Sequence, residues 1–338
     1  MRIGVLTGGG DCPGLNAVIR GVTGRVLDAG DHEVVGIRNG WGGLMENDAY
    51  ALSRDDVRGI LARGGTILGT SRRDPYVHGD GYESIRGAIE ANRIETLVVI
   101  GGDGTLRTAL ELTTEGLPVV AVPKTIDNDI AATDVTFGFD TAVQIATDAI
   151  DRLTTTAEAH NRVILVEVMG RTKGWIATYA GIAAGADAIL IPEHQLSLEE
   201  VAGIIRRRHR RGRHYSIVVV AEGIEPPTAV ELPKDAYGFE RLGGVAYQVA
   251  PALEELTGFE TRVTVLGHLQ RGGTPTAFDR VLATRLGTAA AELALEGHSG
   301  VMVALRGMET RPVPLEDACS GVRGVDEDLF AVARIFFD

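Results

Sequence analysis

A chain of 338 residues is long enough for two domains or one large domain with a buried core. Its net charge of −13 argues against binding to nucleic acid or to acidic membranes, so an anionic ligand must be met by local clusters of Arg and Lys. Its two cysteines, Cys12 and Cys319, provide neither a disulfide framework nor a metal site. No run approaches the ~20 apolar residues of a membrane span, and the first residues enter a strand pattern directly, so we expect a cytoplasmic protein.

The first predicted strand, residues 3–7, is followed by a glycine-rich loop at 8–14 and a helix over about 15–27. A glycine loop between a strand and a helix can place backbone N–H groups around an anion, and a tight turn of small residues is the alternative. The loop is not G-x-G-x-x-G, and no acidic residue ends the next predicted strand, 34–37. The sequence therefore does not predict a dinucleotide-binding fold of the dehydrogenase type.

Two more glycine-rich segments follow. Residues 39–44 are predicted as a loop, in which Trp41 either stacks on a base or caps the core. Residues 63–73 end in Arg72 and Arg73, which are either a solvated surface pair or contacts to a nucleotide. A helix is predicted over 82–95.

The most informative stretch covers residues 97–130. Two apolar runs rich in β-branched residues, 97–100 and 119–122, are predicted as buried parallel strands with a helix over 106–112 between them. The sequence GGDGT follows the first strand, and KTIDND follows the second. Because ligands bind outside the carboxyl ends of strands in open α/β sheets, both clusters are expected at one sheet edge. Bare backbone, a lysine, a hydroxyl and carboxylates together favour phosphoryl transfer.

Helices and strands continue to alternate after residue 130, which indicates a second βαβ-type sheet and an α/β fold. Helices are expected over about 140–155, 172–186, 198–211 and 278–295, followed by a final helix. Strands are expected over 162–169, 188–191, 217–220, 262–266 and 301–305. A Pro-rich segment at 225–243 is predicted as an exposed loop.

Charged and polar residues recur at the ends of the predicted strands: Asp103, Asp127, Asp129, Arg171, Glu222, Arg262, His268 and Arg271. A single Arg at such a place is commonly a structural ion pair, whereas this many indicate the walls of a cleft. Glycine loops can hold a phosphoryl donor, and Arg side chains bind a phosphorylated acceptor bidentately. One Asp can accept the proton of the acceptor hydroxyl, and another can hold Mg²⁺.

With GGDGT, PKTIDND, MGR and LGHLQRGG present in this order, the chain resembles the 6-phosphofructokinase family over nearly its whole length. NAD kinases and lipid kinases carry a motif like GGDG but have no reason to carry the other three. The resemblance implies two three-layer α/β/α (Rossmann-like) domains with the active site in the cleft between them. Residues 1–138 with about 270–320 would bind ATP and Mg²⁺, and residues 139–269 with about 321–338 would bind the sugar phosphate.

The resemblance implies phosphorylation of the 1-hydroxyl of fructose 6-phosphate to fructose 1,6-bisphosphate. Asp127 would be the general base, Asp103 would hold Mg²⁺, and Thr125, Arg171 and Lys124 would complete the catalytic set. The donor would lie along Gly9, Gly10, Arg72, Arg73, Gly102, Asp103, Gly104 and Thr105. The sugar phosphate would contact Thr125, Asp127, Arg162, Met169, Gly170, Arg171, Glu222, Arg262, His268 and Arg271. Residues matching Arg162 and Arg262 come from a neighbouring subunit in this family, which implies self-association, typically a homotetramer in bacteria.

Two positions in the resemblance disagree about the donor. In the family, Gly at position 104 goes with ATP and Asp with pyrophosphate, because a carboxylate there would crowd and repel the α-phosphate of the nucleotide. Lys at position 124 goes with pyrophosphate, and this chain combines Gly104 with Lys124. We expect ATP, because an Asp excludes ATP whereas a Lys near phosphates excludes no donor. The same reaction with pyrophosphate is the alternative, and a non-catalytic sugar-phosphate sensor is a remote one that the retained acidic residues and Arg171 argue against.

Regulation is less well defined by the resemblance. Allosteric bacterial relatives bind ADP or phosphoenolpyruvate through several arginines, and five residues fit that pattern: Arg20, Arg54, Asp187, Arg211 and Arg213. Gly24 and Thr154 stand where such enzymes carry Arg. The basic run at 206–214 belongs either to this site or to a solvated helix end.

Overall fold

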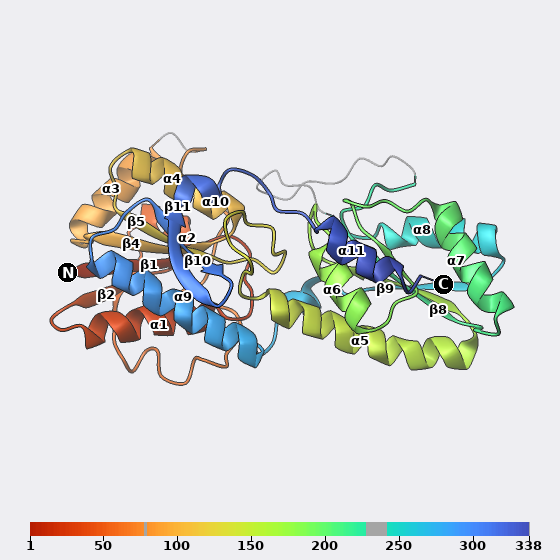
Figure 1. Cartoon of the computed structure of the whole chain (residues 1–338). Coiled ribbons are helices and arrows are strands. Elements are labelled where there is room, and N and C mark those ends of the chain that lie inside the picture. Colours follow the sequence, from red (N-terminus) through yellow and green to blue (C-terminus); the bar gives the residue numbers. More distant parts are fainter. Residues whose placement is uncertain (78–79, 228–241, 338) are drawn as a thin grey trace. The chain divides into compact units, whose positions relative to one another are not determined.

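The structure is a computed structural model that describes residues 1–77, 80–227 and 242–337. The chain forms two compact units, shown with their elements in Figure 1. Unit 1 comprises Met1–Ile126, Ile130–Asp140 and Arg271–Val322, and unit 2 comprises Asp127–Asp129, Thr141–Gln270 and Arg323–Asp338. Which unit binds the donor and which binds the sugar stays a prediction.

The sheet of unit 1 has seven strands in the order β11-β10-β5-β4-β1-β2-β3. Its central strands β1 (Arg2–Thr7), β2 (Glu33–Ile37), β4 (Thr96–Gly101), β5 (Val119–Pro123) and β10 (Val301–Arg306) are parallel. The edge strands β3 (Ala49–Leu52) and β11 (Glu309–Pro314) are antiparallel to their neighbours. Gly101 of β4 pairs with Pro123 of β5, so the two polar clusters begin at the same edge, as predicted.

Helices cover both faces of this sheet, because its central strands are apolar on both sides (Figure 1). The helices α2 (Gly40–Met45), α3 (Gly81–Ala91), α4 (Asp103–Thr114) and α10 (Leu315–Ala318) share one core with alternate strand residues. Helices α1 (Leu15–Asp28) and α9 (Ala277–Leu295) pack against each other on the other face. Their backbones approach closely, since a Cβ at Gly287 would lie 2.5 Å from the Val18 carbonyl oxygen.

Unit 2 contains a four-stranded parallel sheet in the order β7-β8-β6-β9. Its strands are β6 (Val163–Val168), β7 (Ala188–Leu190), β8 (Ser216–Ala221) and β9 (Thr261–Val265). Helices α7 (Leu198–Arg210) and α8 (Ala246–Thr257) share a core with one face, and α5 (Phe139–His160), α6 (Trp175–Ala183) and α11 (Glu327–Arg334) complete the unit (Figure 1). The predicted fold class, two three-layer α/β/α domains, is confirmed.

The prediction of a loop over 39–44 is wrong, because these residues form helix α2. Trp41 is 2% exposed and packs in the core of unit 1, so it does not stack on a base. A helix was not expected from a segment with three glycines in six residues. The glycines are required by packing: a Cβ at Gly43 would lie 1.6 Å from the Arg38 carbonyl oxygen, and Gly40 has a φ of +58°.

The pattern also failed to predict β3, β11 and α8. Most of the predicted loop at 225–243, residues 228–241, lies outside the described residues. Among the helices that the structure describes, none combines the length and apolar character needed to cross a membrane. The cytoplasmic location stays a prediction.

Candidate active site

The turn after β1, residues 8–11, is here called the glycine loop, and it is tightly packed in unit 1. The Gly8 amide donates to the Ile100 carbonyl (2.9 Å), and the Gly9 amide donates to the Ser71 carbonyl (2.9 Å). A Cβ at Gly8 would lie 2.7 Å from the Thr105 side chain, and one at Gly10 would lie 2.5 Å from Nη1 of Arg271. The short side chain of Thr105 therefore favours glycine at position 8, whereas at position 10 the tip of Arg271 would have to move to admit a larger residue.

Side chains from three separate segments donate hydrogen bonds to the carbonyl oxygens of this loop. The Thr70 hydroxyl donates to the Gly9 carbonyl (2.6 Å), and Nζ of Lys124 donates to the Gly10 carbonyl. Nη1 of Arg271 donates to the Asp11 carbonyl (3.2 Å). Lys124 is only 4% exposed, so its ammonium group is held within unit 1 beside the loop. Arg271 was predicted for the sugar site, and its hydrogen bond to Asp11 places its side chain beside this loop of unit 1.

The second glycine-rich turn joins β4 to α4 and meets the first one at Thr105. Thr105 is buried, and a Cβ at Gly101 would lie 2.3 Å from its side chain. Gly102 precedes the first residue of α4, Asp103, whose partly exposed carboxylate forms an ion pair with Arg107 (3.0 Å). A Cβ at Gly104 would meet no atom within 4 Å. The two turns lead into helices α1 and α4, and neither N-cap residue forms a side-chain capping hydrogen bond. Backbone amides at such helix starts suit a polyphosphate.

Arg72 and Arg73, the other predicted donor residues, and Thr125 of the predicted catalytic set lie in further segments of unit 1. Arg73 forms an ion pair with Glu46 and packs over Gly42 of α2, where a Cβ would lie 3.0 Å from its Cδ. Arg72 precedes it directly in the chain. The carbonyl of Thr125, just after β5, accepts a hydrogen bond from the Thr136 hydroxyl (2.8 Å). The predicted donor residues, which come from three segments, and Thr125 of the predicted catalytic set thus all belong to unit 1.

In unit 2, three of the predicted sugar residues, Gly170, Arg171 and Glu222, lie at the carboxyl ends of β6 and β8. Oε1 of Glu222, which follows β8, accepts hydrogen bonds from the amides of Gly170 (3.3 Å) and Arg171 (3.0 Å), which follow β6. Gly170 and Arg171 have φ values of +146° and +51°, so the turn that carries the Arg171 side chain is left-handed. A Cβ at Gly223 would lie 1.9 Å from the Arg171 carbonyl oxygen. The Glu222 carboxylate therefore fixes the backbone from which Arg171 extends.

Two carboxylates lie near each other in this part of unit 2. Burial raises the pKa of Glu222 to about 7, and the charges of Asp127 and Glu167 add to that rise. The amides of Arg171 and Gly170 oppose it by hydrogen bonding to the ionised form. Asp127, the predicted general base, is itself only 4% exposed. Unit 2 thus places Asp127 and the backbone of Arg171 near the Glu222 carboxylate, and their roles stay a prediction.

Gln270 is a residue of this region that the sequence reasoning missed. Its side chain is fully buried; Oε1 accepts from the Met169 amide (3.3 Å) and Nε2 donates to the Gly267 carbonyl (3.1 Å). It connects the turn after β6 to η1 (Gly267–Arg271), the short 3₁₀ helix that carries His268. The signal was present as a polar amide inside LGHLQRGG, but the sequence does not show that it points inward.

Arg162 and Arg262 lie at the other end of the same sheet. Both contact Glu260: Nε of Arg162 lies 2.7 Å from its Oε2, and Arg262 pairs with its Oε1. Arg262 is opposite Ile164 near the start of β6. Since strands rise about 3.3 Å per residue, the start of β6 and the turn carrying Arg171 are about 20 Å apart. Within unit 2, these two arginines cannot contact a ligand held by Arg171.

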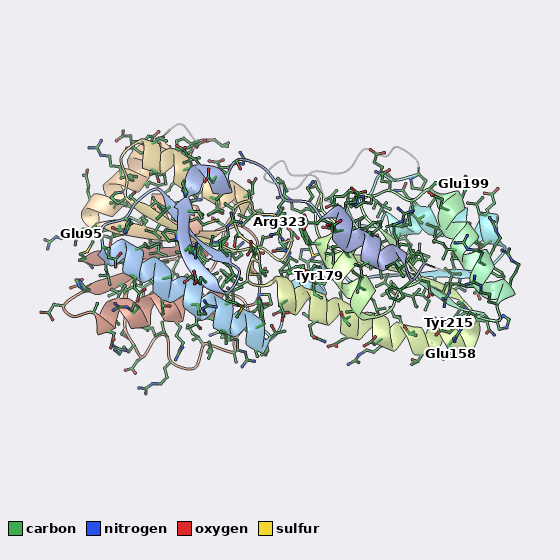
Figure 2. The ribbon with its side chains drawn as sticks, in the orientation of Figure 1. Glu95, Glu158, Tyr179, Glu199, Tyr215 and Arg323 are labelled. Atoms are coloured by element: carbon green, nitrogen blue, oxygen red, sulfur yellow. The ribbon has the colours of Figure 1, made fainter. Side chains whose placement is uncertain are left out.

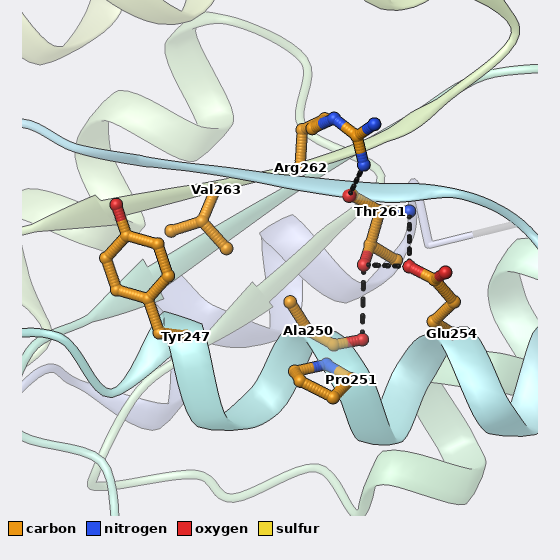
Figure 3. Close-up of a pocket in the computed structure, with 7 residues that line it drawn as sticks. All are labelled: Tyr247, Ala250, Pro251, Glu254, Thr261, Arg262 and Val263. Carbon is orange, nitrogen blue, oxygen red and sulfur yellow. Dashed lines mark hydrogen bonds between the residues drawn. The ribbon is translucent and has the colours of Figure 1, made fainter.

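Arg262 lines a surface pocket of about 560 Å³ between α8 and β9, drawn in Figure 3. Its Nη1 donates to the carbonyl of Thr261 (2.8 Å), whose amide and hydroxyl both donate to Oε2 of Glu254 (3.0 and 2.8 Å). Tyr247, at the start of α8, also lines this pocket and is 62% exposed. This pocket is therefore lined by a cation and by an exposed aromatic side chain.

Some of the predicted effector residues line a second cavity of about 410 Å³ in unit 2. Thr154, Asp187, Arg211 and Arg213 surround it, together with Arg208 and with Tyr215, which is labelled in Figure 2. Asp187 forms an ion pair with Arg208 (2.9 Å) and accepts from the Ile217 amide (2.8 Å).

Burial raises the pKa of Asp187, against the effect of that amide, of Arg208 and of Arg213. Arg20, Gly24 and Arg54 belong to unit 1. The basic run thus contributes both to a cavity and to the last turn of α7, where cations are favoured.

Comparisons by sequence and by structure both match this chain to phosphofructokinases. The family described as phosphofructokinase matches residues 2–294. An ATP-dependent 6-phosphofructokinase 3 of Streptomyces coelicolor is 54% identical, covering 99% of both chains. A pyrophosphate–fructose 6-phosphate 1-phosphotransferase of Amycolatopsis methanolica is 52% identical over the full length of both chains. Among solved structures, phosphofructokinase from Saccharomyces cerevisiae matches with a TM-score of 0.83 and 32% identity, covering 99% of this chain and 46% of that chain.

Proposed function

Because the chain belongs to the phosphofructokinase family, we propose that it transfers the terminal phosphoryl group of ATP to the 1-hydroxyl of fructose 6-phosphate, giving fructose 1,6-bisphosphate and ADP. The observation that carries this proposal is the meeting of two glycine-rich strand–helix turns around Thr105 in unit 1. Backbone amides and the positive ends of helices recognise phosphates without a specific base contact. The full-length similarity to ATP-dependent relatives supports the choice of reaction.

In this proposal unit 1 binds the donor. Asp103 would hold Mg²⁺, and its place in the first turn of α4 suits that role, because Mg²⁺ at phosphoryl-transfer sites takes one or two carboxylates plus phosphate oxygens. No cluster of three or more His, Cys, Asp or Glu side chains stands ready for a metal among the described residues, and such a site needs none. When bound, the ion would neutralise charge on the donor phosphates.

Unit 2 would bind the acceptor and carry out the proton transfer. Asp127 would accept the proton of the 1-hydroxyl as that oxygen attacks the terminal phosphorus, and the bond to the ADP oxygen breaks. Arg171 would stabilise the charge on the transferring group. The Arg171 amide donates to Glu222, and this hydrogen bond holds the backbone from which the guanidinium side chain extends. Met169, Gly170 and His268 would hold the sugar.

The choice between ATP and pyrophosphate depends on Gly104 and Lys124. The space beside Gly104 is open, so the site leaves room where a carboxylate would repel a nucleotide. Lys124 donates to the glycine loop, which is a role compatible with either donor. A coupled spectrophotometric assay should show turnover of fructose 6-phosphate with Mg-ATP. Turnover with pyrophosphate alone would replace this proposal by its alternative, the activity named for the Amycolatopsis relative.

We also propose that active sites are shared between copies of the chain. Arg162 and Arg262 lie about 20 Å from the turn that carries Arg171 in the same unit. We therefore expect that a sugar phosphate bound by Arg171 of one copy contacts Arg162 and Arg262 of another copy. Mixed oligomers test this sharply. D127A and R262A should each be inactive, and refolding them together should restore part of the activity, because one hybrid site then has both intact residues. No recovery would contradict shared sites.

Effector control rests on the cavity that contains Asp187, Arg211 and Arg213. Arg208, Arg211 and Arg213 line this cavity, and three arginines suit a phosphorylated effector. Thr154 supplies no charge there. Sigmoidal dependence on fructose 6-phosphate that ADP relieves would support this proposal. Hyperbolic kinetics that neither ADP nor phosphoenolpyruvate changes would remove it.

A further inference from the structure

Three of the four residues of the glycine loop have a carbonyl oxygen that accepts a hydrogen bond from a side chain. The carbonyls of Gly9, Gly10 and Asp11 accept from Thr70, Lys124 and Arg271 respectively. The three donors come from sequence positions far apart. A loop of small residues has wide conformational freedom, and three side-chain bonds to consecutive carbonyls remove it.

These bonds determine where the loop's amides point. A trans peptide unit is planar, with its C=O and the following N–H in opposite directions. Holding the Gly9 carbonyl toward Thr70 therefore aims the Gly10 N–H away from Thr70, and the Lys124 bond does the same for the Asp11 N–H. In the described part of the chain, the amides of Gly10 and Asp11 have no acceptor. Two consecutive N–H groups that the protein leaves without an acceptor can together bind an anion.

Thr70 lies in a segment that is itself firmly held. The carbonyl of Ser71 accepts from the Gly9 amide (2.9 Å), and its hydroxyl donates to the Asn39 carbonyl (2.7 Å). The preceding carbonyl, of Gly69, accepts from the Thr7 hydroxyl (2.7 Å). Thr70 is therefore a rigid support with one hydroxyl directed at the loop, and Gly9 is bonded to this segment through both its N–H and its C=O.

We propose that Thr70 is a positioning residue for the phosphoryl donor: its hydroxyl orients the Gly9–Gly10 peptide so that the Gly10 N–H meets a phosphate oxygen. This rests on the proposed function, in which the glycine loop faces the donor. The same segment continues into Arg72 and Arg73, so one short stretch would align both the phosphate end and the nucleotide end of the donor. Thr70 itself does not contact the donor in this proposal.

The test compares T70V, which removes the hydroxyl with little change of shape, with T70S, which keeps it. Losing one neutral hydrogen bond of this kind should raise KM for ATP about fivefold. kcat should stay within about twofold, and KM for fructose 6-phosphate should not change, because the groups that act on the acceptor are untouched. T70S should behave as the wild type. The control is T284V, which removes a 2.7 Å hydroxyl–carbonyl bond to Arg280 within α9 of the same unit and should change none of these constants.

An unchanged KM for ATP in T70V would overturn the proposal, and so would T70S as impaired as T70V, since packing of the methyl group would then be responsible. If T70V does not fold, T70A removes the same hydroxyl and takes its place. If the wild type uses only pyrophosphate, KM for pyrophosphate is read instead. If it uses neither donor, the proposed function fails. Calorimetric binding of tripolyphosphate to T70V and T70S then decides the role of Thr70 separately: weaker binding to T70V alone supports it, and equal binding refutes it.

Discussion

Replacing Glu222 by Gln should stabilise unit 2 at neutral and alkaline pH, and the gain should be much smaller at pH 5. The carboxyl group is buried and near Asp127, and its pKa in the folded chain is about 7 against an ordinary value of 4.5. The folded state therefore holds a proton there over a range in which the unfolded state has lost it. In that range the unfolding free energy falls as the pH rises.

The size of the effect follows from the pKa values. At 1.36 kcal/mol per unit, a rise from 4.5 to about 7 corresponds to a penalty of about 3 kcal/mol once the pH is well above 7. Well below pH 4.5 the group is protonated in both states and the penalty vanishes. Gln has no charge at any pH and still accepts from the Gly170 and Arg171 amides. The difference between E222Q and wild type should thus grow from about 1 kcal/mol at pH 5 to about 3 kcal/mol at pH 8.5.

Tryptophan emission can follow unit 2 by itself. The chain has two tryptophans, and Trp175 lies in unit 2, buried, with its Nε1 donating to the Arg323 carbonyl (3.0 Å). Trp41 lies in unit 1, and its Nε1 has no acceptor among the described residues, so W41F removes no hydrogen bond. Urea unfolding of W41F and W41F/E222Q between pH 5 and 8.5 gives the difference directly.

Glu254 provides a matched control in the same unit. Its pKa is lowered, first by the amide of Thr261 and then by the hydroxyl of that residue. A carboxylate with a lowered pKa contributes stability that is fully present above its unfolded value and is lost only at lower pH. E254Q should therefore be less stable than the wild type by an amount that stays constant from pH 5 to 8.5. If the E222Q difference were equally constant, or shrank as the pH rose, the reasoning about Glu222 would be refuted.

Three further changes test other parts of the proposals. D127A should abolish turnover and leave fructose 6-phosphate binding measurable by calorimetry, and unchanged turnover would refute the general base. G104D should lower kcat/KM for ATP about a hundredfold, because about 2.7 kcal/mol of charge repulsion is expected to act on the α-phosphate; an unaffected value would show that position 104 does not face the nucleotide. R208A leaves the buried Asp187 carboxylate without its ion-pair partner and should lower the unfolding free energy by about 2 kcal/mol at pH 8, with a smaller loss under acidic conditions that protonate Asp187.

The sheets were predictable because their strands carry a strong local signal. The runs 97–100 and 119–122 are apolar and β-branched, which is typical of strands buried on both faces, and both are strands of the unit 1 sheet. Functional side chains follow such strands directly, so their common edge could be predicted as well. Helix α2 had no comparable signal: its glycines are required by close contacts with Arg38 and Thr7, and these contacts exist only after folding.

Contacts made by supporting residues could not be predicted for the same reason. The Thr70 hydroxyl and the Gly9 carbonyl are 61 positions apart, and neither belongs to a periodic pattern. Gln270 was inside a recognised motif, yet its burial and its bond to the Met169 amide depend on the pairing of β6 with β9. The sequence places residues at strand ends, whereas which neighbour a side chain bonds depends on the assembled sheet.

The contact of Lys124 changes how its conflict with Gly104 is understood. If the ammonium group only neutralised pyrophosphate, it would be expected to face the phosphate without a hydrogen bond to the protein backbone. Instead it donates to the Gly10 carbonyl and is almost fully buried. A cation in that place aims the next N–H and adds positive potential to the loop, and both effects help a terminal phosphoryl group whatever it is attached to. Discrimination between ATP and pyrophosphate then falls to position 104, where the open space beside Gly104 admits the rest of a nucleotide.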